Sequence, residues 1–255
     1  MAYTTIDNPE LYFQTKLYTG NGGTQSITLD GSEDMQPDWV WFKNRSASAG
    51  GKIYDSVRGV QEVLSSNETD AESTTSAGLT AFGTDGFSVG SYSDINGSGN
   101  GIVAWNWKAG TSFTNDASAT GVGSIDSSGS VSTTAGFSII TYSGTDGTAT
   151  VAHGLGVAPD FIWFKRRNAS KNNTAYHSAL GNTYSAYPDN TSAASTNYDY
   201  FADTSPTSSV FTVKKDEDYD ETNASGGNYV AWCFASKQGY SKFGSYQGNS
   251  STDGT

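Results

Sequence analysis

The chain has 255 residues, a formal net charge of −12 and a pI near 4.4, so it lacks the basic surface that neutralises phosphates, and we expect no nucleic-acid binding. Aromatic residues make up 13% of the chain and glycine contributes 30 residues, which is typical of short strands and many turns. The composition predicts an all-β protein that is long enough for two domains.

The N-terminal residues, MAYTTIDNPELYFQTK, show no basic region followed by an apolar run, so they predict no signal peptide. No apolar run approaches the 18 residues of a spanning helix, and we expect no membrane insertion. We therefore expect synthesis in a host cytoplasm and release by another route, such as assembly into a virus particle. Residues 1–13 precede the repeated blocks and are interpreted as an N-terminal docking segment.

The chain contains an internal repeat. PDWVWFKNR at residues 37–45 matches PDFIWFKRR at residues 159–167, which lies 122 residues further on. YDS at residues 54–56 matches YHS at residues 176–178 at the same spacing. Three more blocks match in the same order at offsets of 124 to 127: YTG 18–20 with YSG 142–144, FSV 87–89 with FTV 211–213, and VAWNW 103–107 with VAWCF 230–234.

The repeat divides the chain into domains. Residues 14–109 and 136–237 are the two copies, and each is predicted to be an antiparallel β-sandwich of the jelly-roll or lectin-like kind. Residues 110–135 are small and polar and predict a Ser/Thr/Gly-rich linker, with room for a short strand or two. Residues 238–255 resemble the start of a third copy and are interpreted as a C-terminal extension.

The strands can be recognised within each copy. The block at residues 37–45 is apolar on both faces, which indicates a central strand that is covered on both sides. The polar stretch at residues 59–80 predicts a long loop with one helical turn. The tryptophans all lie in apolar strands, so we interpret them as core residues: Trp39, Trp41, Trp105, Trp107, Trp163 and Trp232.

The residues with catalytic potential do not form a known pattern. His153 and His177 both lie in the second copy, and the chain contains no GxSxG block. It also lacks the H-x-x-x-H and C-x-x-C spacings of zinc sites. The single cysteine, Cys233, lies in an apolar run and is interpreted as a buried residue. We expect a non-enzymatic protein without a cofactor, with calcium as the one exception to consider.

The calcium hypothesis comes from the acidic run DEDYDE at residues 216–221. A solvated loop is the default interpretation of such a run. The alternative is a Ca²⁺ site, because alternating carboxylates supply the hard oxygens that calcium prefers. Its candidate ligands are Asp216, Asp218 and Asp220, although the EF-hand pattern is not met.

Two further groups of aromatic residues suggest contacts with other molecules. Tyrosines in polar loops are candidate glycan contacts, because sugar rings stack on exposed aromatic faces: Tyr184, Tyr187, Tyr198 and Tyr200. Apolar residues near the two chain ends are candidate assembly contacts: Leu11, Tyr12, Phe13, Tyr240, Phe243 and Tyr246. We expect at least one end to dock on a neighbouring subunit or another virion protein, which predicts a homo-oligomer. The alternative is that both ends fold back on their own repeats.

Five blocks of the first copy, LYTGNGGTQSITL, QPDWVWFKNR, KIYDSVRGVQEVLSSN, GLTAFGTDGFSVG and IVAWNWKAG, together resemble a repeat domain of marine phage structural proteins. These are the tail-fibre-like proteins of cyanophages and pelagiphages. The resemblance covers most of the first copy and is looser in the second, which lacks the YDSVRG and LSSN strings.

The resemblance implies a non-enzymatic virion structural protein on the particle surface, and it transfers no catalytic residues. We therefore expect a tail-fibre or appendage protein that contributes to assembly and to host-surface attachment, with host glycans as potential partners. The alternatives are a capsid head-decoration or knob protein and, from another class, a glycan-binding or glycan-degrading β-sandwich protein.

Overall fold

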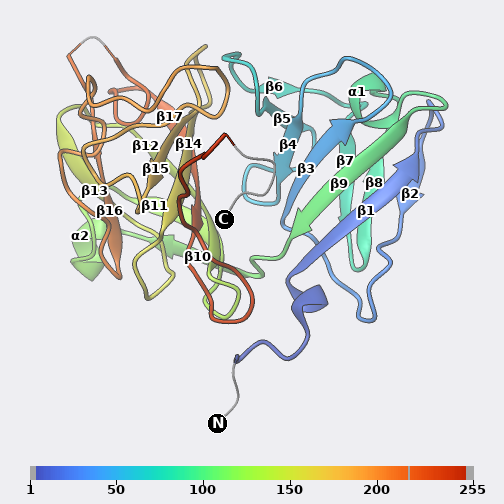
Figure 1. The fold of residues 1–255 in the computed structure, drawn as a ribbon, viewed down its shortest axis with the longest axis horizontal. Helices are drawn as coiled ribbons and strands as arrows, with labels where there is room; N and C mark the ends of the chain where they lie inside the picture. Colours follow the sequence, from blue (N-terminus) through green and yellow to red (C-terminus); the bar gives the residue numbers. More distant parts are fainter. Residues whose placement is uncertain (1–3, 218, 251–255) are drawn as a thin grey trace.

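The computed structural model describes residues 4–217 and 219–250, and its strands form two β-sandwiches that lie side by side (Figure 1). The described helical elements are short: the 3-10 turn η1 (Pro9–Leu11), α1 (Ser93–Asn96) and α2 (Ala117–Thr120). None of the helices in this part of the chain is long and apolar enough to cross a membrane. The predicted all-β, sandwich-like fold is confirmed.

The first sandwich has a six-stranded sheet and a facing three-stranded sheet. The large sheet has the spatial order β1 (Phe13–Thr19), β9 (Gly101–Trp107), β3 (Trp39–Asn44), β4 (Lys52–Asp55), β5 (Glu62–Ser65) and β6 (Ser73–Thr74). The small sheet has the order β2 (Gln25–Ile27), β8 (Gly86–Val89) and β7 (Leu79–Gly83). Val40 and Phe42 of β3 point into the core between them, where the Phe42 ring lies 5.1 Å from that of Phe87.

The second sandwich repeats this plan with different flanking strands. Its large sheet has the order β10 (Thr111–Asn115), β11 (Ser127–Ser132), β12 (Phe137–Ser143), β17 (Asn228–Phe234), β14 (Phe161–Arg166) and β15 (Thr174–His177). The facing pair is β13 (Thr148–Ala152) and β16 (Val210–Lys214). Phe164 of β14 and Phe211 of β16 meet in the core with ring centroids 5.4 Å apart.

The repeated sequence blocks occupy equivalent strands. The order β1-β9-β3-β4 in the first sheet corresponds to β12-β17-β14-β15 in the second. The register corresponds as well, since Trp39 lies opposite Trp107 in the first sheet and Phe161 lies opposite Phe234 in the second. Both β3 and β14 are central strands, so the predicted placement of the two PD-containing blocks is confirmed.

The segment at residues 110–135 supplies β10 and β11, so the short strands for which the prediction left room are present, and they belong to a sheet rather than to a linker. Val131 lies in β11, and Ile125 forms an isolated bridge to the second sandwich. A Cβ atom at Gly129 would lie 2.3 Å from the Ile139 carbonyl oxygen, so this position of β11 needs glycine to approach β12. The small residues that suggested a flexible linker therefore serve a close strand pairing.

The predicted loop at residues 59–80 is wrong, since β5 and β6 lie within it and β7 begins at its end. Val63 and Leu64 of β5 are 5% and 2% exposed, and Leu79 of β7 is fully buried. These few apolar anchors are enough to hold short strands in an otherwise polar stretch. The polar residues between the anchors dominate the composition and conceal the strands.

The tryptophans lie on the faces of the two large sheets that point toward each other. Trp39, Trp163 and Trp232 are 2%, 5% and 0% exposed and belong to one apolar cluster that both sheets share. The ring of Trp39 lies 5.6 Å from that of Trp232 across the interface. The central strands β3 and β14 are thus covered on both faces, as expected. One face packs on the small sheet of the same sandwich, and the other face packs on the other sandwich. Trp41, Trp105 and Trp107 are only half-buried, and Trp41 and Trp107 pack against this cluster from its rim.

Buried charges also connect the two sandwiches. Arg58 of the first sandwich is fully buried and donates to Asp55 at 2.6 Å and to Glu72 at 2.7 Å. Glu72 also accepts from Arg167 of the second sandwich at 2.6 Å. Trp232 of the second sandwich donates to the Asp55 carboxylate at 3.1 Å. Because burial leaves these charges little water, their mutual pairing is required for the contact to be stable.

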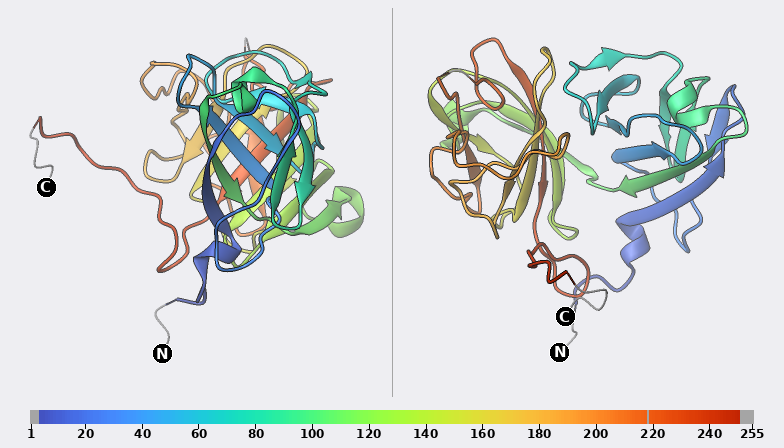
Figure 2. Two further views of the ribbon diagram at one scale, coloured as in Figure 1. Left: turned by 90° about the vertical axis from the view of Figure 1, so that its right-hand side faces the viewer. Right: turned by 45° about the horizontal axis from the view of Figure 1, so that its top comes forward.

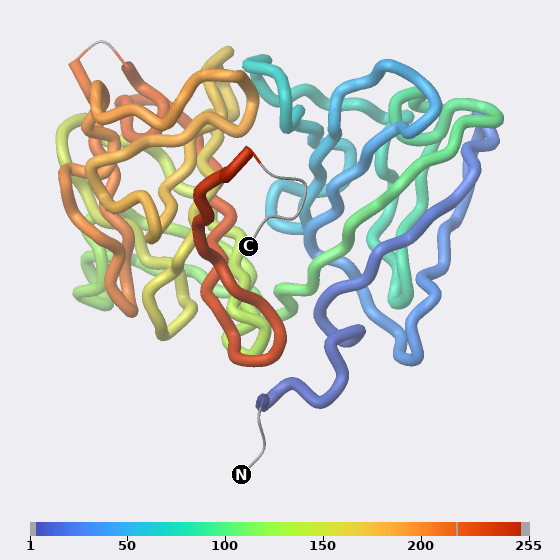
Figure 3. The backbone as a smooth tube through the Cα atoms, viewed as in Figure 1, coloured from blue at the N-terminus to red at the C-terminus, as the bar shows by residue number. Residues whose placement is uncertain are grey.

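The two chain ends pack on the chain itself. Tyr12 and Tyr240 meet with ring centroids 6.4 Å apart, and Phe13 lies 4.7 Å from Trp107. Phe243 stacks on Phe161 at 6.0 Å. The red C-terminal segment passes in front of the space between the sandwiches (Figures 1 and 3). Phe13 and Phe243 thus pack on their own repeats and Tyr12 and Tyr240 on each other, while docking on a neighbouring subunit stays a prediction.

Two assembly candidates remain accessible. Leu11 is half-buried in η1, and Tyr246 is 95% exposed. Residues 244–250 extend away from the body of the molecule (Figure 2). Residues 1–3 and 251–255 of the predicted terminal segments lie outside the described residues.

Candidate functional site

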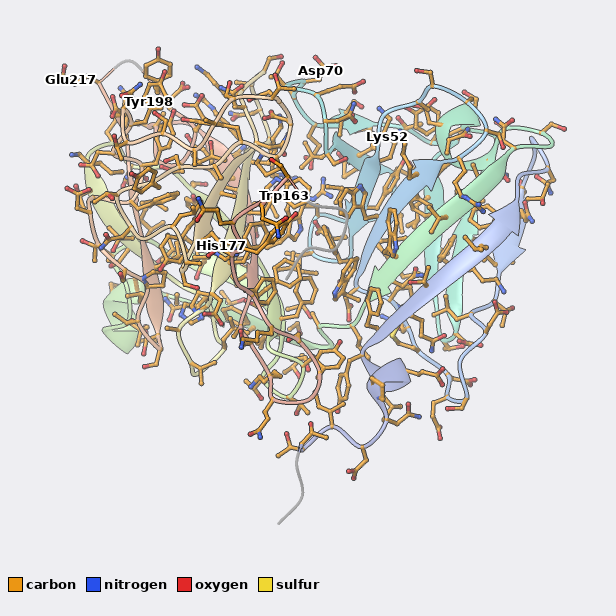
Figure 4. The ribbon with its side chains drawn as sticks, viewed as in Figure 1. Lys52, Asp70, Trp163, His177, Tyr198 and Glu217 are labelled. Atoms are coloured by element: carbon orange, nitrogen blue, oxygen red, sulfur yellow. The ribbon has the colours of Figure 1, made fainter. Side chains whose placement is uncertain are left out.

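A polar pocket of about 350 Å³ lies mainly on the loop of the second sandwich between β15 and β16, with one residue from before β15 and one from after β16. We call it the tyrosine pocket. Its lining combines phenol rings with amide and hydroxyl side chains: Asn172, Tyr187, Asn190, Ser192, Ala193, Ser195, Asn197, Tyr198, Tyr200 and Tyr219. Figure 4 shows Tyr198 at the upper end of the second sandwich, on the side away from the first.

The loop that carries the pocket is anchored to the core. Tyr200 and Phe201 are 0% and 3% exposed and belong to the core of the second sandwich. Ser185 forms isolated backbone bridges to Ser195, which bring distant parts of the loop together. The Asp189 carboxylate accepts from the Asn173 amide at 2.6 Å. The loop is therefore irregular in backbone but fixed in position, which suits a binding surface on a rigid scaffold.

Four tyrosines form the aromatic wall of the pocket. Tyr198 stacks on Tyr200 with centroids 5.5 Å apart and an interplanar angle of 17°. Tyr219 contacts Tyr198 at 4.3 Å, and Tyr187 meets it edge-on at 6.3 Å. Tyr187, Tyr198 and Tyr200 were three of the four predicted glycan contacts, and the structure brings them together. Tyr184 is 39% exposed and does not line the pocket.

Buried polar groups lie at and next to the tyrosine pocket. Tyr187 and Tyr200 line it, and the buried hydroxyl of Tyr200 interacts with the side chains of Tyr187 and Glu221. Burial raises the pKa of Tyr187 to about 12 and raises the pKa of Tyr200 further. Burial also raises the pKa of the Glu221 carboxyl, whose other oxygen accepts from Asn172 at 3.3 Å. Such groups gain most from a ligand that brings its own hydroxyl groups.

Sequence reasoning missed the amides of this pocket and Tyr219. Asn172, Asn190 and Asn197 lie far apart in the chain and meet only because the loop folds back on itself. Their one sequence signal was the unusual density of Asn and Tyr between residues 172 and 200. Tyr219 was hidden in the acidic run, whose charges drew the interpretation toward calcium.

A second cavity region lies between the sandwiches. Cavities of about 370 and 550 Å³ share Trp41, Phe161 and Trp163 in their linings and form what we call the aromatic groove. Trp107 lines one part of it and Trp105 the other. Figure 4 shows Trp163 on the side of the second sandwich that faces the first.

The C-terminal tail partly covers the aromatic groove. Tyr240 and Phe243 line the smaller cavity, and the Phe243 ring also lies 5.9 Å from that of Phe234. At the other end, Trp41 donates to the Ser66 hydroxyl at 3.2 Å. Trp41, Trp105 and Trp107 are therefore half-buried because they line a groove between the two copies of the repeat. A sequence pattern within one copy could not show this groove.

The chain belongs to the family described as Domain of unknown function (DUF7483). The family model matches residues 8–255, so it covers both sandwiches and the tail. A search of curated proteins found no match to the chain. One DUF7483 model thus spans both copies of the repeat and the aromatic groove between them.

In this DUF7483 domain the described residues of the acidic run have separate partners. Asp220 forms ion pairs with Arg166 and Lys171; although burial raises its pKa, these cations lower it below its usual value. Asp216 accepts from the Asp199 amide at 2.9 Å. Asp218 lies outside the described residues. Among the residues the structure describes, no group of three or more potential ligands surrounds one point, so the calcium hypothesis stays a prediction without support.

The two histidines and the cysteine contact the backbone or the core of the second sandwich. His153 is fully buried, bonds through Nε2 to the Thr207 carbonyl at 3.1 Å, and has its pKa lowered by burial. His177 accepts from the Ala179 amide through Nδ1 at 3.0 Å. Cys233 is fully buried, and burial raises the pKa of its thiol far above the usual range. The interpretation of Cys233 as a buried apolar residue agrees with this placement.

Proposed function

We propose that this chain is a non-enzymatic structural and attachment protein on the surface of a bacteriophage particle, belonging to a tail fibre or similar appendage. In this proposal the tyrosine pocket binds a glycan of the host surface. The observation that carries the proposal is the convergence of four tyrosines and three asparagines in one pocket of a firmly anchored loop.

The chemistry of the pocket suits a sugar. The faces of Tyr198 and Tyr219 offer an apolar surface to the C–H groups of a pyranose ring. The amide groups of the pocket can each donate and accept hydrogen bonds, as sugar hydroxyls require. The buried hydroxyls at the base would discriminate between epimers, since a missing partner there costs about 1–3 kcal/mol.

The scaffold supports an attachment role. The paired charges of Arg58, Glu72 and Arg167 and the shared tryptophan cluster hold the two sandwiches as one body. A rigid body keeps the pocket in a fixed orientation on a particle. A net charge of −12 favours mutual repulsion over aggregation where many copies lie close together. The resemblance to phage tail-fibre-like proteins supports the virion location.

Glycan binding is tested with Tyr198→Ala and Asn197→Ala. Surface polysaccharide fractions of candidate hosts are titrated against the intact chain by calorimetry. We expect each variant to weaken binding at least about tenfold, which corresponds to about 1.4 kcal/mol. Tyr246→Ala is the matched control, because Tyr246 is 95% exposed on the tail and should leave affinity unchanged. Equal affinity for all three variants would refute the pocket as the binding site.

The particle location is tested by labelling phage particles with an antibody against the chain and imaging them by electron microscopy. Label at the tail or its appendages supports the proposal. Label spread over the head would instead establish the head-decoration alternative. Release of reducing ends from the bound polysaccharide would replace the non-enzymatic assignment with a glycan-degrading one.

A further inference from the structure

The outer edge of β1 carries no partner strand. β1 is first in the order of its sheet and pairs with β9 on one side only. Its equivalent in the second sandwich, β12, pairs with β17 on the corresponding side and with β11 on the other. The second copy therefore fills an edge with its own chain that the first copy leaves open, along the outer side of the molecule (Figures 1 and 2).

The backbone of this edge points outward. The Lys108 amide donates to the carbonyl of Tyr12, the residue opposite it, so even-numbered residues of β1 direct their amides and carbonyls at β9. Odd-numbered residues direct theirs to the open side. Within the described part of the chain, no hydrogen bond reaches the amide or carbonyl of Thr15 or Leu17.

Leu17 places an apolar side chain at the middle of the open strand β1. Leu17 is 56% exposed, more than any other leucine, isoleucine or valine among the described residues. Edge strands are commonly protected by a charge or a proline that blocks pairing. Lys16, the one charged residue of β1, lies on the opposite face and pairs with Asp30. The edge at Leu17 therefore lacks this protection.

We propose that β1 pairs with β1 of a second copy of this chain, antiparallel about a two-fold axis at Leu17. In this register the two Leu17 residues exchange both backbone hydrogen bonds, and Thr15 of each copy lies opposite Thr19 of the other. Lys16 then lies opposite Tyr18. A register centred on Lys16 would place two ammonium groups directly opposite each other, which is unfavourable.

A second copy fits this edge better than a segment of the same chain. The tail, which could have supplied a strand, packs instead on Tyr12 and Phe161. Among the described residues, the half-buried Gln25 side chain competes for this edge only at its end, where it donates to the Thr19 carbonyl at 3.3 Å. Two-fold pairing occupies both edges at once, so assembly closes at the dimer.

The dimer should be weak in solution. One strand pair with two leucines buries less than the roughly 1,200–2,000 Å² of stable interfaces. Many copies held on one surface would raise the local concentration and favour pairing there. The inference rests on the strand edge alone, so it would stand if the glycan pocket or the virion location were refuted.

Disulfide trapping tests the register. With Leu17→Cys the two Cα atoms would lie about 5.5 Å apart, within the roughly 4.4–6.8 Å range of disulfides. The native Cys233 is fully buried and does not compete. We expect Leu17→Cys to form a covalent dimer under mild oxidation. The matched control is Thr19→Cys, whose two copies would lie about 14 Å apart and should remain monomeric.

Mixing Thr15→Cys with Thr19→Cys should give a covalent heterodimer, because these positions face each other in the proposed register. Cross-linking of Leu17→Cys no faster than that of Thr19→Cys would overturn the proposal.

Sedimentation velocity tests the dimer without a cross-link. We expect the wild-type chain to show reversible dimerisation at concentrations up to about 1 mM, the weak end of specific interfaces. Leu17→Lys should abolish it, with an unchanged melting temperature because the side chain faces solvent. Leu180→Lys, at a 38% exposed leucine outside any strand, should dimerise like the wild type. A strictly monomeric wild type, or an equal loss in both variants, would overturn the proposal.

Discussion

Replacing Trp39 with alanine tests whether the two sandwiches unfold as one body. The Trp39 ring is 2% exposed and lies 4.5 Å from Trp107 in its own sheet. It also lies 5.6 Å from Trp232 and 6.4 Å from Trp163 of the other sandwich. Its indole nitrogen has no hydrogen-bond partner among the described residues, so the substitution removes packing alone. Truncating a buried tryptophan to alanine typically costs about 3–5 kcal/mol.

Because much of that packing crosses the interface, the coupling between the sandwiches should fall as well. We expect the single thermal transition of the wild type to lose about 10 °C, given roughly 2–4 °C per kcal/mol at this chain length, and to split into two. Differential scanning calorimetry measures both effects. Trp105→Ala is the control, because Trp105 is half-buried and its ring contacts Trp41 alone among the described aromatics. An unchanged transition for Trp39→Ala, or an equal shift for Trp105→Ala, would refute this expectation.

Three further predictions concern buried polar groups. Glu72→Gln removes the anion between Arg58 and Arg167 and should cost about 3–5 kcal/mol in urea denaturation, because Arg167 loses its anion and buried Arg58 keeps only Asp55; a cost below about 1 kcal/mol would contradict the coupling role. Burial lowers the pKa of Lys165 to about 8, while the unfolded chain keeps a lysine pKa of about 10.4. Between these values the unfolded state binds more protons, so the free energy of unfolding should rise with pH from 8 to about 10. Lys165→Met should remove this rise. If the free energy of unfolding of wild type and variant changed in parallel with pH, the assignment would be refuted. Cys233 should react with a thiol reagent only as fast as the chain unfolds globally, and rapid labelling under native conditions would contradict its burial.

The repeat made the architecture predictable at the level of strand positions. The matching blocks around Trp39 and Phe161 share one register in their two sheets, because side chains that pack the same core must recur at the same spacing. Apolar residues on both faces of these blocks correctly predicted central strands. The pattern could not show which layer covers the second face. That layer is the other copy, and its contact depends on the path of the whole chain.

The errors have a common physical cause. β11 contains four serines and a glycine, yet it pairs along its length with β12. β5 depends on Val63 and Leu64, which are two apolar residues in a polar stretch. Pairing with a strand that is already fixed needs backbone groups and little side-chain burial, so composition underestimates such strands, which here lie second from the edge of their sheets.

The tyrosine pocket was predictable in part. Tyr187 and Tyr198 were selected as loop aromatics among polar residues, and the structure places both in the pocket. Tyr184 met the same description but points elsewhere, because the irregular loop has no period from which a direction could be derived. The terminal aromatics Tyr12 and Phe243 were expected to need a cover, and the cover is the chain itself.

The differences between the two copies lie where the two proposals place their sites. Strands shared by both copies, such as β3 and β14, are explained by packing, so they carry no information about function. Between β4 and β8 the first copy builds the short strands β5, β6 and β7, whereas the second copy builds the loop with the tyrosine pocket at the same place. Conversely, the second copy covers β12 with β11, whereas the first leaves β1 open. If both proposals hold, the second copy binds the ligand and the first joins neighbouring molecules. Substituting Leu17 should then change assembly but not glycan affinity. Substituting Tyr198 should change glycan affinity but not assembly.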